Sequence, residues 1–233
     1  LQPSGQSVAL QSMSTETPVI ITKTQGFWKE DDFKHLKNIY FVKTVLNNED
    51  IEYEFITLYD RRNLQIEVIN KFKVIENKFI ANFMSHIEIY KNISESEDDY
   101  GLVLEDDSIP DKKFNNNVYN YLNKLPKEFD LFYISPGKGN FHIPYFKRRP
   151  FKKIYKKENE ITSWGGHGAS RYADAYFISN KCASLLYDEF INCNEKIDTT
   201  IDWWKNQMID KLKLNVYWAE PTIIKTNVYE TSF

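Results

Sequence analysis

The sequence lacks several features that would place it in a special class of protein. Its 233 residues contain no apolar run of about 18 residues, so no membrane span is expected. The two cysteines, Cys182 and Cys193, are too few for a disulfide framework or a zinc site. Glycine and proline number only eight each, against 15 tyrosines and 16 phenylalanines, which favours a packed domain over a disordered or repetitive chain.

An excess of positive charge is also absent. The chain has 30 Lys and Arg against 33 Asp and Glu, so it has no overall basic field, and nucleic acid is not an expected partner. Residues 1–12 lack the charged start and apolar stretch of a secretory signal, which makes the cytoplasm the expected compartment. We expect residues 1–13 to be a tail added during cloning and residues 14–233 to form a single domain.

Short apolar segments alternate with stretches of helical periodicity. Helical spacing runs from Val68 to Tyr90 as one long or broken helix, from a cap at Asn180 to Phe190, and from Ile197 to Leu212. Strands are expected at Val19–Thr22, Tyr53–Leu58, Gly101–Leu104, Asp130–Ser135, Asp174–Ser179, Val216–Trp218 and Ile223–Ile224. This alternation predicts an α/β fold with a mostly parallel central sheet flanked by helices.

Three acids, Glu105, Asp106 and Asp107, directly follow the apolar segment that ends at Leu104. Ligands of open α/β sheets bind beyond the carboxyl ends of the strands, and three carboxylates at such an end repel one another unless a cation is present. Side chains alternate along extended chain, so Glu105 and Asp107 point the same way and can share one Mg²⁺ or Mn²⁺. The alternative is a solvated acidic turn. These three residues alone do not favour the metal site over the turn.

The segments around these acids resemble glycosyltransferase family 25, which includes lipopolysaccharide and collagen galactosyltransferases. The family shows a Ser-His pair on a helix with an aromatic residue one turn later, and an apolar strand that ends in Leu-Glu-Asp-Asp. The similar blocks occur in the family's order: Ile51–Phe55, Asn82–Tyr90, Tyr100–Asp107, Asp130–Ile134, Ala175–Ala183 and Ile201–Trp203.

The resemblance implies a GT-A-type fold, a UDP-sugar donor and a Mn²⁺ ion (or Mg²⁺). It carries the metal role onto Glu105 and Asp107, with Asp106 close to the donor. The reaction it implies is transfer of a hexose, such as galactose or glucose, to a hydroxyl acceptor on a glycan or protein. The first strand departs from the family, because it runs Ile20–Gln25 where the family has an Asn-Leu-x-Arg-Arg-like element. The alternative is therefore a catalytically degenerate domain that only binds carbohydrate or a partner protein. A third hypothesis, a Mg²⁺-dependent phosphoryl-transfer enzyme, ranks last because the sequence has no P-loop.

Two further acids are candidates for the base that deprotonates the acceptor hydroxyl. Asp202 and Asp198 are spaced one helical turn apart, and an ionised Asp within hydrogen-bond reach of a hydroxyl can take its proton. Acids are also favoured at a helix N-terminus by the macrodipole. We favour the catalytic role for Asp202 and the structural role for Asp198.

The remaining candidates would bind the donor or the acceptor. His86 would contact the donor phosphate or order the carboxylate loop, with a structural hydrogen bond to a neighbouring strand as the equal alternative. His167 and Arg171 lie in a Gly-rich segment that would close over the donor, where Arg171 would pair with phosphate; the alternative is a surface loop. Trp203 would form a platform for the acceptor beside Asp202.

Overall fold

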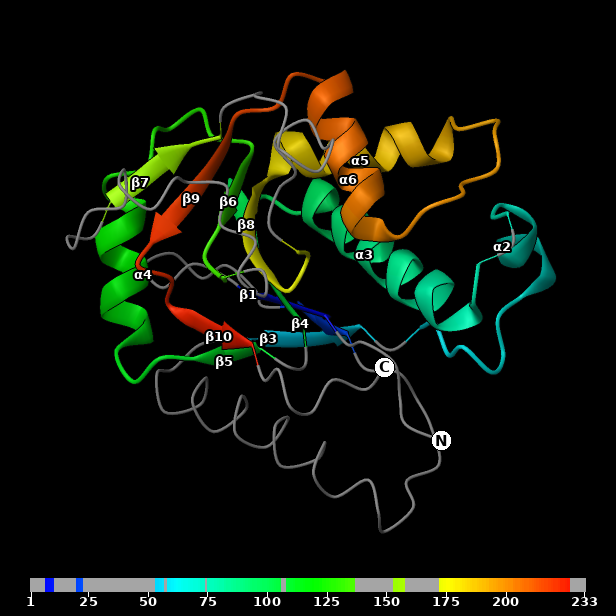
Figure 1. The fold of residues 1–233 in the computed structure, drawn as a ribbon, viewed down its shortest axis with the longest axis horizontal. Helices are drawn as coiled ribbons and strands as arrows, with labels where there is room; N and C mark the ends of the chain where they lie inside the picture. The colour runs from blue at the N-terminus through cyan, green and yellow to red at the C-terminus, as the bar shows by residue number, and fades with distance from the viewer. Residues whose placement is uncertain are drawn as a thin grey trace, which may run out of the picture.

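Strands and helices alternate along the chain and build a central sheet covered on both faces (Figure 1). The computed structural model describes residues 7–10, 20–22, 53–56, 58–73, 75–105, 108–136, 153–157 and 172–226. Within them, eight strands form one sheet in the order β1-β3-β2-β4-β8-β6-β9-β7. Their bounds are Ser7–Leu10 (β1), Ile20–Thr22 (β2), Tyr53–Ile56 (β3), Tyr100–Glu105 (β4), Leu131–Tyr133 (β6), Lys153–Lys156 (β7), Ala175–Ser179 (β8) and Val216–Glu220 (β9). A separate pair joins β5 (Ser108–Pro110) to β10 (Ile224–Thr226).

The two faces of the sheet are covered by different helices (Figure 1). On one face lie α3 (Asn77–Glu95), α5 (Asn180–Ile191) and α6 (Ile201–Lys211), and on the other lies α4 (Phe114–Leu122). None of the described helices combines the length and the apolar character needed to cross a bilayer.

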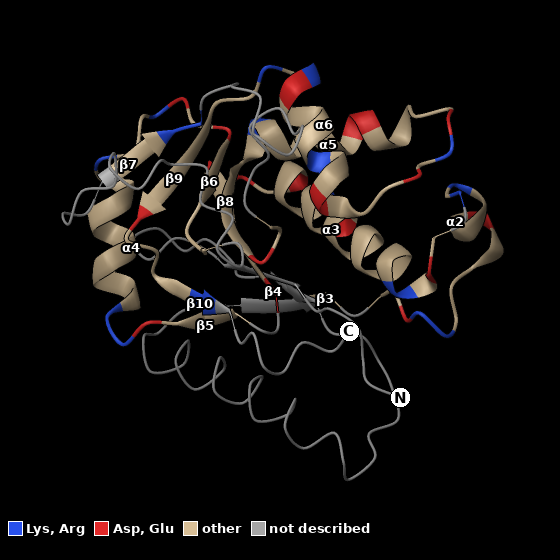
Figure 2. Ribbon diagram, in the orientation of Figure 1, with Lys and Arg blue, Asp and Glu red and all other residues tan. Residues whose placement is uncertain are grey.

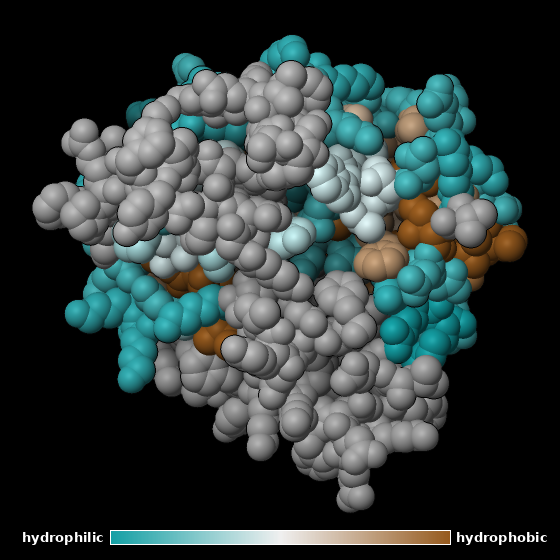
Figure 3. All heavy atoms as spheres, viewed as in Figure 1, coloured by the Kyte–Doolittle hydropathy of each residue, from teal (hydrophilic) through white to brown (hydrophobic). Residues whose placement is uncertain are grey.

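The short helix α2 (Ile66–Asn70) lies at the edge of the molecule. Hydrophilic residues cover much of the described surface in Figure 3, and apolar residues show on the side of α2 and in a smaller area on the opposite side of the view. Ile66 is 60 % exposed and Leu58 is 66 % exposed. Scattered apolar residues of this kind are normal on protein surfaces and do not mark a binding face by themselves.

The α/β class is confirmed, but the sheet is mixed rather than mostly parallel. Strand β8 runs antiparallel between β4 and β6, and β7 runs antiparallel to β9. Parallel pairing is found for β2 with β3, β2 with β4, and β6 with β9. The direction of β8 was not predictable from its residues, because a strand buried on both faces has the same continuous apolar pattern in either direction. The arrangement is compatible with the GT-A-like fold that the family resemblance implies.

Alternation along β4 decides which face its last residue occupies. Leu102 and Leu104 pack in the cluster that contains α4, whereas Val103 packs against α3 on the opposite face. Since side chains alternate with a period of two, Glu105 lies on the same face as Val103. Gly101 allows α3 to approach closely, because a Cβ at that position would lie 2.6 Å from the Cδ1 atom of Ile93.

Several predicted boundaries need correction. The helical pattern from Val68 to Tyr90 is broken, which was one of the two predicted alternatives, and it forms the two helices α2 and α3. Asn180 is the first residue of α5 and not its cap; the cap is Ser179, whose Oγ accepts a hydrogen bond from the backbone N–H of Cys182 at 3.1 Å. The Asn180 side chain instead donates to the carbonyls of Ile93 and Ser96, which ties α5 to the end of α3.

The N-terminal segment contributes to the sheet. Ser7–Leu10 forms β1, which pairs antiparallel with β3 and with β4. Part of the segment that we expected to be a cloning tail therefore packs with the domain, and its origin stays a prediction.

Candidate active site

Side chains from α3 and β4 meet at the carboxyl end of β4. Glu105 is the last residue of this strand, and its Oε1 accepts a hydrogen bond from the Nδ2 of Asn82 at 3.2 Å. The same oxygen lies 3.3 Å from the Nε2 of His86, one turn further along α3. The carboxyl end of a strand is where ligands of α/β sheets bind, so the two α3 side chains fix Glu105 at a functional position.

A chain of buried hydrogen bonds extends from Glu105 into the protein. The Nδ1 of His86 lies 2.8 Å from the hydroxyl of Tyr176 on β8, and that hydroxyl lies 3.0 Å from the hydroxyl of Tyr90 on α3. The rings of His86 and Tyr176 are also stacked, with centroids 6.0 Å apart. His86, Tyr90 and Tyr176 are all buried.

One protonation pattern satisfies all the hydrogen bonds from Glu105 to Tyr90. Burial, and secondarily the charge of Lys205, lower the pKa of His86 to about 3, so the ring is neutral and carries one N–H. An ionised carboxylate only accepts, so this N–H is on Nε2 and donates to Glu105. The Nδ1 of His86 then accepts from Tyr176, and Tyr176 accepts from Tyr90. These hydrogen bonds hold His86 in one tautomer and Glu105 in one orientation.

Tyr176→Phe should destabilise the protein more than Tyr90→Phe. The first change removes two hydrogen bonds and leaves His86 and Tyr90 without a partner at these atoms, whereas the second removes one. We expect the free energy of unfolding to fall by about 1–3 kcal/mol for Tyr176→Phe, since buried polar groups are costly to leave unsatisfied. Urea unfolding measures the change, with Tyr119→Phe as the matched control because that side chain is 61 % exposed. Equal free energies of unfolding for the Tyr176 and Tyr119 variants would contradict the hydrogen bonds assigned to Tyr176.

Asp202 joins the cluster from the first turn of α6. Its Oδ1 accepts a hydrogen bond from the backbone N–H of Ala173 at 2.6 Å. Among the described residues, none donates a hydrogen bond to its Oδ2. Burial and the nearby charge of Glu105 raise the pKa of Asp202 to about 6, although Lys205, the Ala173 amide and His86 act in the opposite direction. The carboxyl is therefore mostly ionised at neutral pH and is a stronger base than an ordinary Asp.

Asp198 lies outside this cluster. It precedes α6, which begins at Ile201, so it is not one turn earlier on the same helix as the sequence spacing predicted. Its side chain is 59 % exposed, and its Oδ2 pairs with the Nζ of Lys73 at 3.0 Å. This surface ion pair differs from the helix N-terminal position that the sequence suggested for a structural Asp198, and the choice of a structural role stays a prediction.

The other predicted site residues lie outside the described residues. These are Asp106, Asp107, His167 and Arg171. Their predicted roles in binding the metal and the donor stay predictions.

Four residues of the cluster were missed by sequence reasoning as functional candidates: Asn82, Tyr90, Tyr176 and Lys205. Asn82, His86 and Tyr90 follow one another at four-residue spacing, which places them on one face of α3, and this signal was available in the sequence. Lys205 lies four residues after Ile201 on the buried side of α6. A charged residue on a buried stripe is unusual and is the signal that could have identified it. Figure 2 shows that α6 carries both acidic and basic segments.

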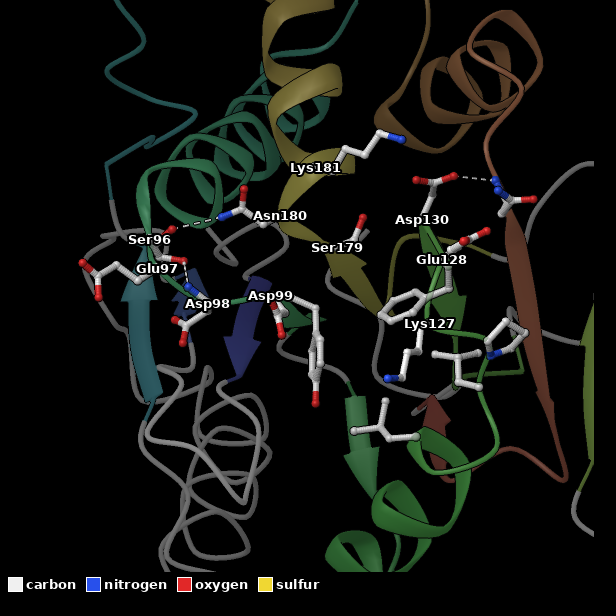
Figure 4. A pocket seen from close by; sticks show the side chains of 16 residues that line it. Ser96, Glu97, Asp98, Asp99, Lys127, Glu128, Asp130, Ser179, Asn180 and Lys181 are labelled. Atoms are coloured by element: carbon white, nitrogen blue, oxygen red, sulfur yellow. Dashed lines mark hydrogen bonds between the residues drawn. The ribbon is translucent and has the colours of Figure 1, made fainter.

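A large cavity lies at the opposite end of β4. Its volume is about 1000 Å³, and Asp99 and Tyr100, at the start of β4, line it together with Asp130 and Lys181 (Figure 4). Asp130 is held there by a hydrogen bond from the backbone N–H of Asn215 at 2.7 Å. Since β4 runs from Tyr100 to Glu105, roughly 16 Å of strand separate this cavity from Glu105. The cavity is therefore distinct from the acid cluster.

The residues around Glu105 fit a hard divalent cation. Asn82 donates its N–H to Glu105, which fixes the orientation of the amide, and its Oδ1 is buried without a hydrogen-bond partner in the described part of the chain. An oxygen in this position and a carboxylate are the ligands that Mg²⁺ and Mn²⁺ prefer. No group of three or more His, Cys, Asp or Glu within the described residues could hold a metal ion. The role of Asp107 as a further ligand, with Asp106 close by, stays a prediction because both lie outside the described residues.

Fold and site together describe an α/β domain in which acidic and basic side chains gather at the carboxyl end of a central strand. The family model of glycosyltransferase family 25 (LPS biosynthesis protein) matches residues 40–201, which is more than half of the chain. The protein belongs to glycosyltransferase family 25, which confirms the resemblance seen in the sequence. No individual curated protein matches the chain. Membership in the family indicates glycosyl transfer, and it implies a nucleotide-sugar donor and an acceptor.

Proposed function

We propose that the protein is a metal-dependent hexosyltransferase. It would move a hexose, such as galactose or glucose, from a UDP-sugar to a hydroxyl of a glycan or protein acceptor. The observation that supports this most is the meeting of Glu105 and Asp202 at the carboxyl end of β4, close enough for each charge to influence the other. Family membership supports glycosyl transfer as the reaction class.

Asp202 is the proposed base. Its Oδ2 would accept the proton of the acceptor hydroxyl while the hydroxyl oxygen forms a bond to the anomeric carbon of the donor sugar. The bond between that carbon and the diphosphate oxygen breaks, and UDP leaves with the electron pair. The hydrogen bond from the Ala173 amide keeps the carboxyl in one rotamer during this step.

Glu105 and Asp107 are the proposed ligands of Mn²⁺ or Mg²⁺. When bound, the ion would supply positive charge that stabilises the leaving diphosphate. His86 and the Nδ2 of Asn82 would hold Glu105 in the orientation that the metal needs, because hydrogen bonds to a metal-ligating carboxylate fix its position. The Oδ1 of Asn82 would be available to the ion as a further oxygen ligand. Asp106, His167 and Arg171 complete the proposed donor site, with Arg171 paired to phosphate.

Two exposed aromatic residues are proposed to receive the acceptor. Trp203 is 49 % exposed and follows Asp202 directly, and Tyr172 is 36 % exposed and precedes Ala173, which donates to Asp202. Trp203 is therefore next to the proposed base in the sequence, and Tyr172 is next to the residue whose amide donates to it. Aromatic rings combine a large apolar face with a polar edge, which suits an acceptor glycan.

Transfer should be lost as the pH falls through about 6. Asp202 accepts a proton only when ionised, and its pKa is about 6, so kcat/KM should decline tenfold per pH unit below that value. His86 stays neutral over this range because its pKa is about 3. The profile is measured between about pH 5 and 8, with circular dichroism at each pH to verify folding. A flat profile down to pH 5 in folded protein would count against Asp202 as the base.

Calorimetric titration with UDP and Mn²⁺ tests the proposed function against the alternative of a degenerate binding domain. The proposal predicts UDP binding that is strengthened by Mn²⁺, because a bound ion would offset the negative charges of Glu105 and of the diphosphate. A transfer assay with UDP-hexoses then identifies the sugar. Absence of binding by both UDP and Mn²⁺ would favour the degenerate domain and overturn the proposal.

A further inference from the structure

The cavity at the start of β4 has no part in the proposed transfer reaction. Its volume of about 1000 Å³ lies at the upper end of the range for ligand-binding pockets and is far larger than a metal ion needs. Two separate stretches of the chain form its walls, the turn that joins α3 to β4 and the segment that joins α4 to β6 (Figure 4). Asp99 lies on the first wall, and Glu128 and Asp130 lie on the second. A ligand between the walls would therefore meet carboxylates on both sides.

Hydrogen bonds from the end of β8 and the start of α5 fix the frame of this cavity. The backbone N–H of Asn180 donates to the carbonyl of Asp99 at 2.8 Å, and that of Ser179 donates to the carbonyl of Asp130 at 3.0 Å. The Asn180 side chain also donates to the carbonyl of Ser96 at 3.1 Å. Both walls are therefore tied to the same central strand, and the cavity is preformed.

Asp130 presents a buried carboxylate with one oxygen left for a ligand. The residue is only 8 % exposed, and its Oδ2 accepts a hydrogen bond from the backbone N–H of Asn215 at 2.7 Å. Its Oδ1 accepts no hydrogen bond from the residues that the structure describes. Each carboxylate oxygen can accept hydrogen bonds, and a buried polar atom without a donor costs free energy. A donor group on a bound molecule would remove that cost.

The negative charge of the cavity is not neutralised by ion pairs. Five acids and two lysines line it. The exposed carboxylates of Asp99 and Glu128 make no hydrogen bond or ion pair with other described residues. Neither Lys127 nor Lys181 pairs with an acid in that part of the chain. Since like charges in one cavity repel, a positively charged ligand is favoured and an anionic ligand is disfavoured.

The rest of the lining indicates what carries the positive charge. Leu125, Tyr100 and Phe129 provide apolar surface, and the rings of Tyr100 and Phe129 have centroids 5.8 Å apart. Lysine and arginine side chains lay their aliphatic stems on such surface while the charged ends reach carboxylates, and aromatic rings attract cations. Lys127 and Lys181 can donate to the carbonyl oxygens of a peptide, whereas a polyamine has no acceptor to offer them.

We propose that this cavity binds a segment of a protein partner that carries two or more lysine or arginine side chains. One basic side chain would pair with Asp130, and the others would pair with the exposed acids of the two walls. The cavity is then a protein-docking site at the opposite end of β4 from Glu105, roughly 16 Å along the strand. This inference does not depend on the proposed transfer reaction.

Fluorescence anisotropy with a fluorescein-labelled peptide of alternating lysine and alanine tests the proposal. The wild-type protein should bind this peptide, and the affinity should fall with added salt because exposed charges are screened. A matched peptide with glutamate in place of lysine should not bind. Asp130→Asn should weaken binding of the lysine peptide about tenfold or more, because it removes the buried charge while its oxygen can still accept from the Asn215 amide.

The double variant Asp99→Asn/Glu128→Gln makes the test independent of whether Asp130→Asn folds. Both side chains are exposed and make no bond with other described residues, so the fold should survive. Binding of the lysine peptide should weaken about three- to tenfold, the effect of losing two exposed ion pairs. Glu67→Gln/Asp210→Asn is the matched control, because it removes the same two charges at exposed positions outside the cavity. Circular dichroism verifies the fold of each variant.

The expected result is weaker binding by the double variant, unchanged binding by the control, and poor competition by spermidine. No binding of the lysine peptide to the wild type would overturn the proposal. Equal affinities of the double variant and the control would also overturn it, because the peptide would then bind outside the cavity. Spermidine that competes as strongly as the unlabelled peptide would assign the cavity to small polyamines and refute a protein partner.

Discussion

Asp202→Asn should lower kcat by a factor of about 10²–10⁴ while the KM for the donor stays close to the wild-type value. The amide cannot accept the proton of the acceptor hydroxyl, but its oxygen can still accept the hydrogen bond from the Ala173 amide. The local structure of α6 should therefore survive the change. Steady-state transfer assays with varied donor and varied acceptor give the two parameters separately.

Asp198→Asn is the matched control for this experiment. It makes the same chemical change four residues earlier, in a side chain that is exposed and paired with Lys73. Exposed ion pairs contribute little, so this variant should keep both the activity and the stability of the wild type. A loss of kcat in Asp198→Asn comparable to that in Asp202→Asn, or full activity in Asp202→Asn, would refute the assignment of the base.

Glu105→Gln should abolish most of the donor turnover and its dependence on Mn²⁺. The substitution keeps the shape of the side chain and an oxygen that can accept from Asn82 and His86, but it removes the negative charge that binds the ion. The loss of turnover should exceed the roughly 10–100-fold effect that is usual for changes in residues that contact the metal's ligands but not the metal itself. Asp107→Ala should show the same loss with an intact fold, because the two acids are proposed to share the ion.

The control for Glu105→Gln is Glu97→Gln. Glu97 is exposed and lies before β4, at the opposite end of the strand from Glu105. Its neutralisation should leave turnover and the response to Mn²⁺ unchanged. Mn²⁺-dependent turnover at the wild-type level in Glu105→Gln would show that the ion is held elsewhere.

Local sequence patterns were sufficient to predict the strand that carries the site. The apolar residues Leu102, Val103 and Leu104 buried as predicted, and the acid that follows them lies at the carboxyl end of β4. The alternation of side chains predicted that Glu105 and Asp107 point the same way, which stays a prediction because Asp107 lies outside the described residues. These are local properties of a strand, and a single segment determines them.

The convergence of the site could not be predicted from spacing alone. His86, Glu105 and Asp202 lie on three elements that are far apart in the sequence, and only the packing of α3 and α6 on one face of the sheet brings them together. The resemblance to family 25 supplied part of this information by placing the blocks in order. The antiparallel direction of β8 was missed because its residues are buried on both faces.

The proton affinities in the site depend on tertiary structure in the same way. An isolated Asp titrates near 4, and the rise to about 6 at Asp202 comes from burial and from Glu105, which is 97 positions away in the chain. The neutral state of His86 likewise comes from burial beneath β8. The sugar, the acceptor and the cellular compartment remain predictions from the sequence and its family.

A structure of the protein with bound UDP and Mn²⁺, with the ion located by its anomalous scattering, tests the central claim most directly. The account predicts a manganese peak within roughly 2–2.5 Å of a Glu105 carboxylate oxygen, in contact with the diphosphate and on the same side of the sheet as Asp202. A nucleotide and ion bound instead in the cavity at the start of β4, or a Glu105 carboxylate that turns away from the ion, would contradict it.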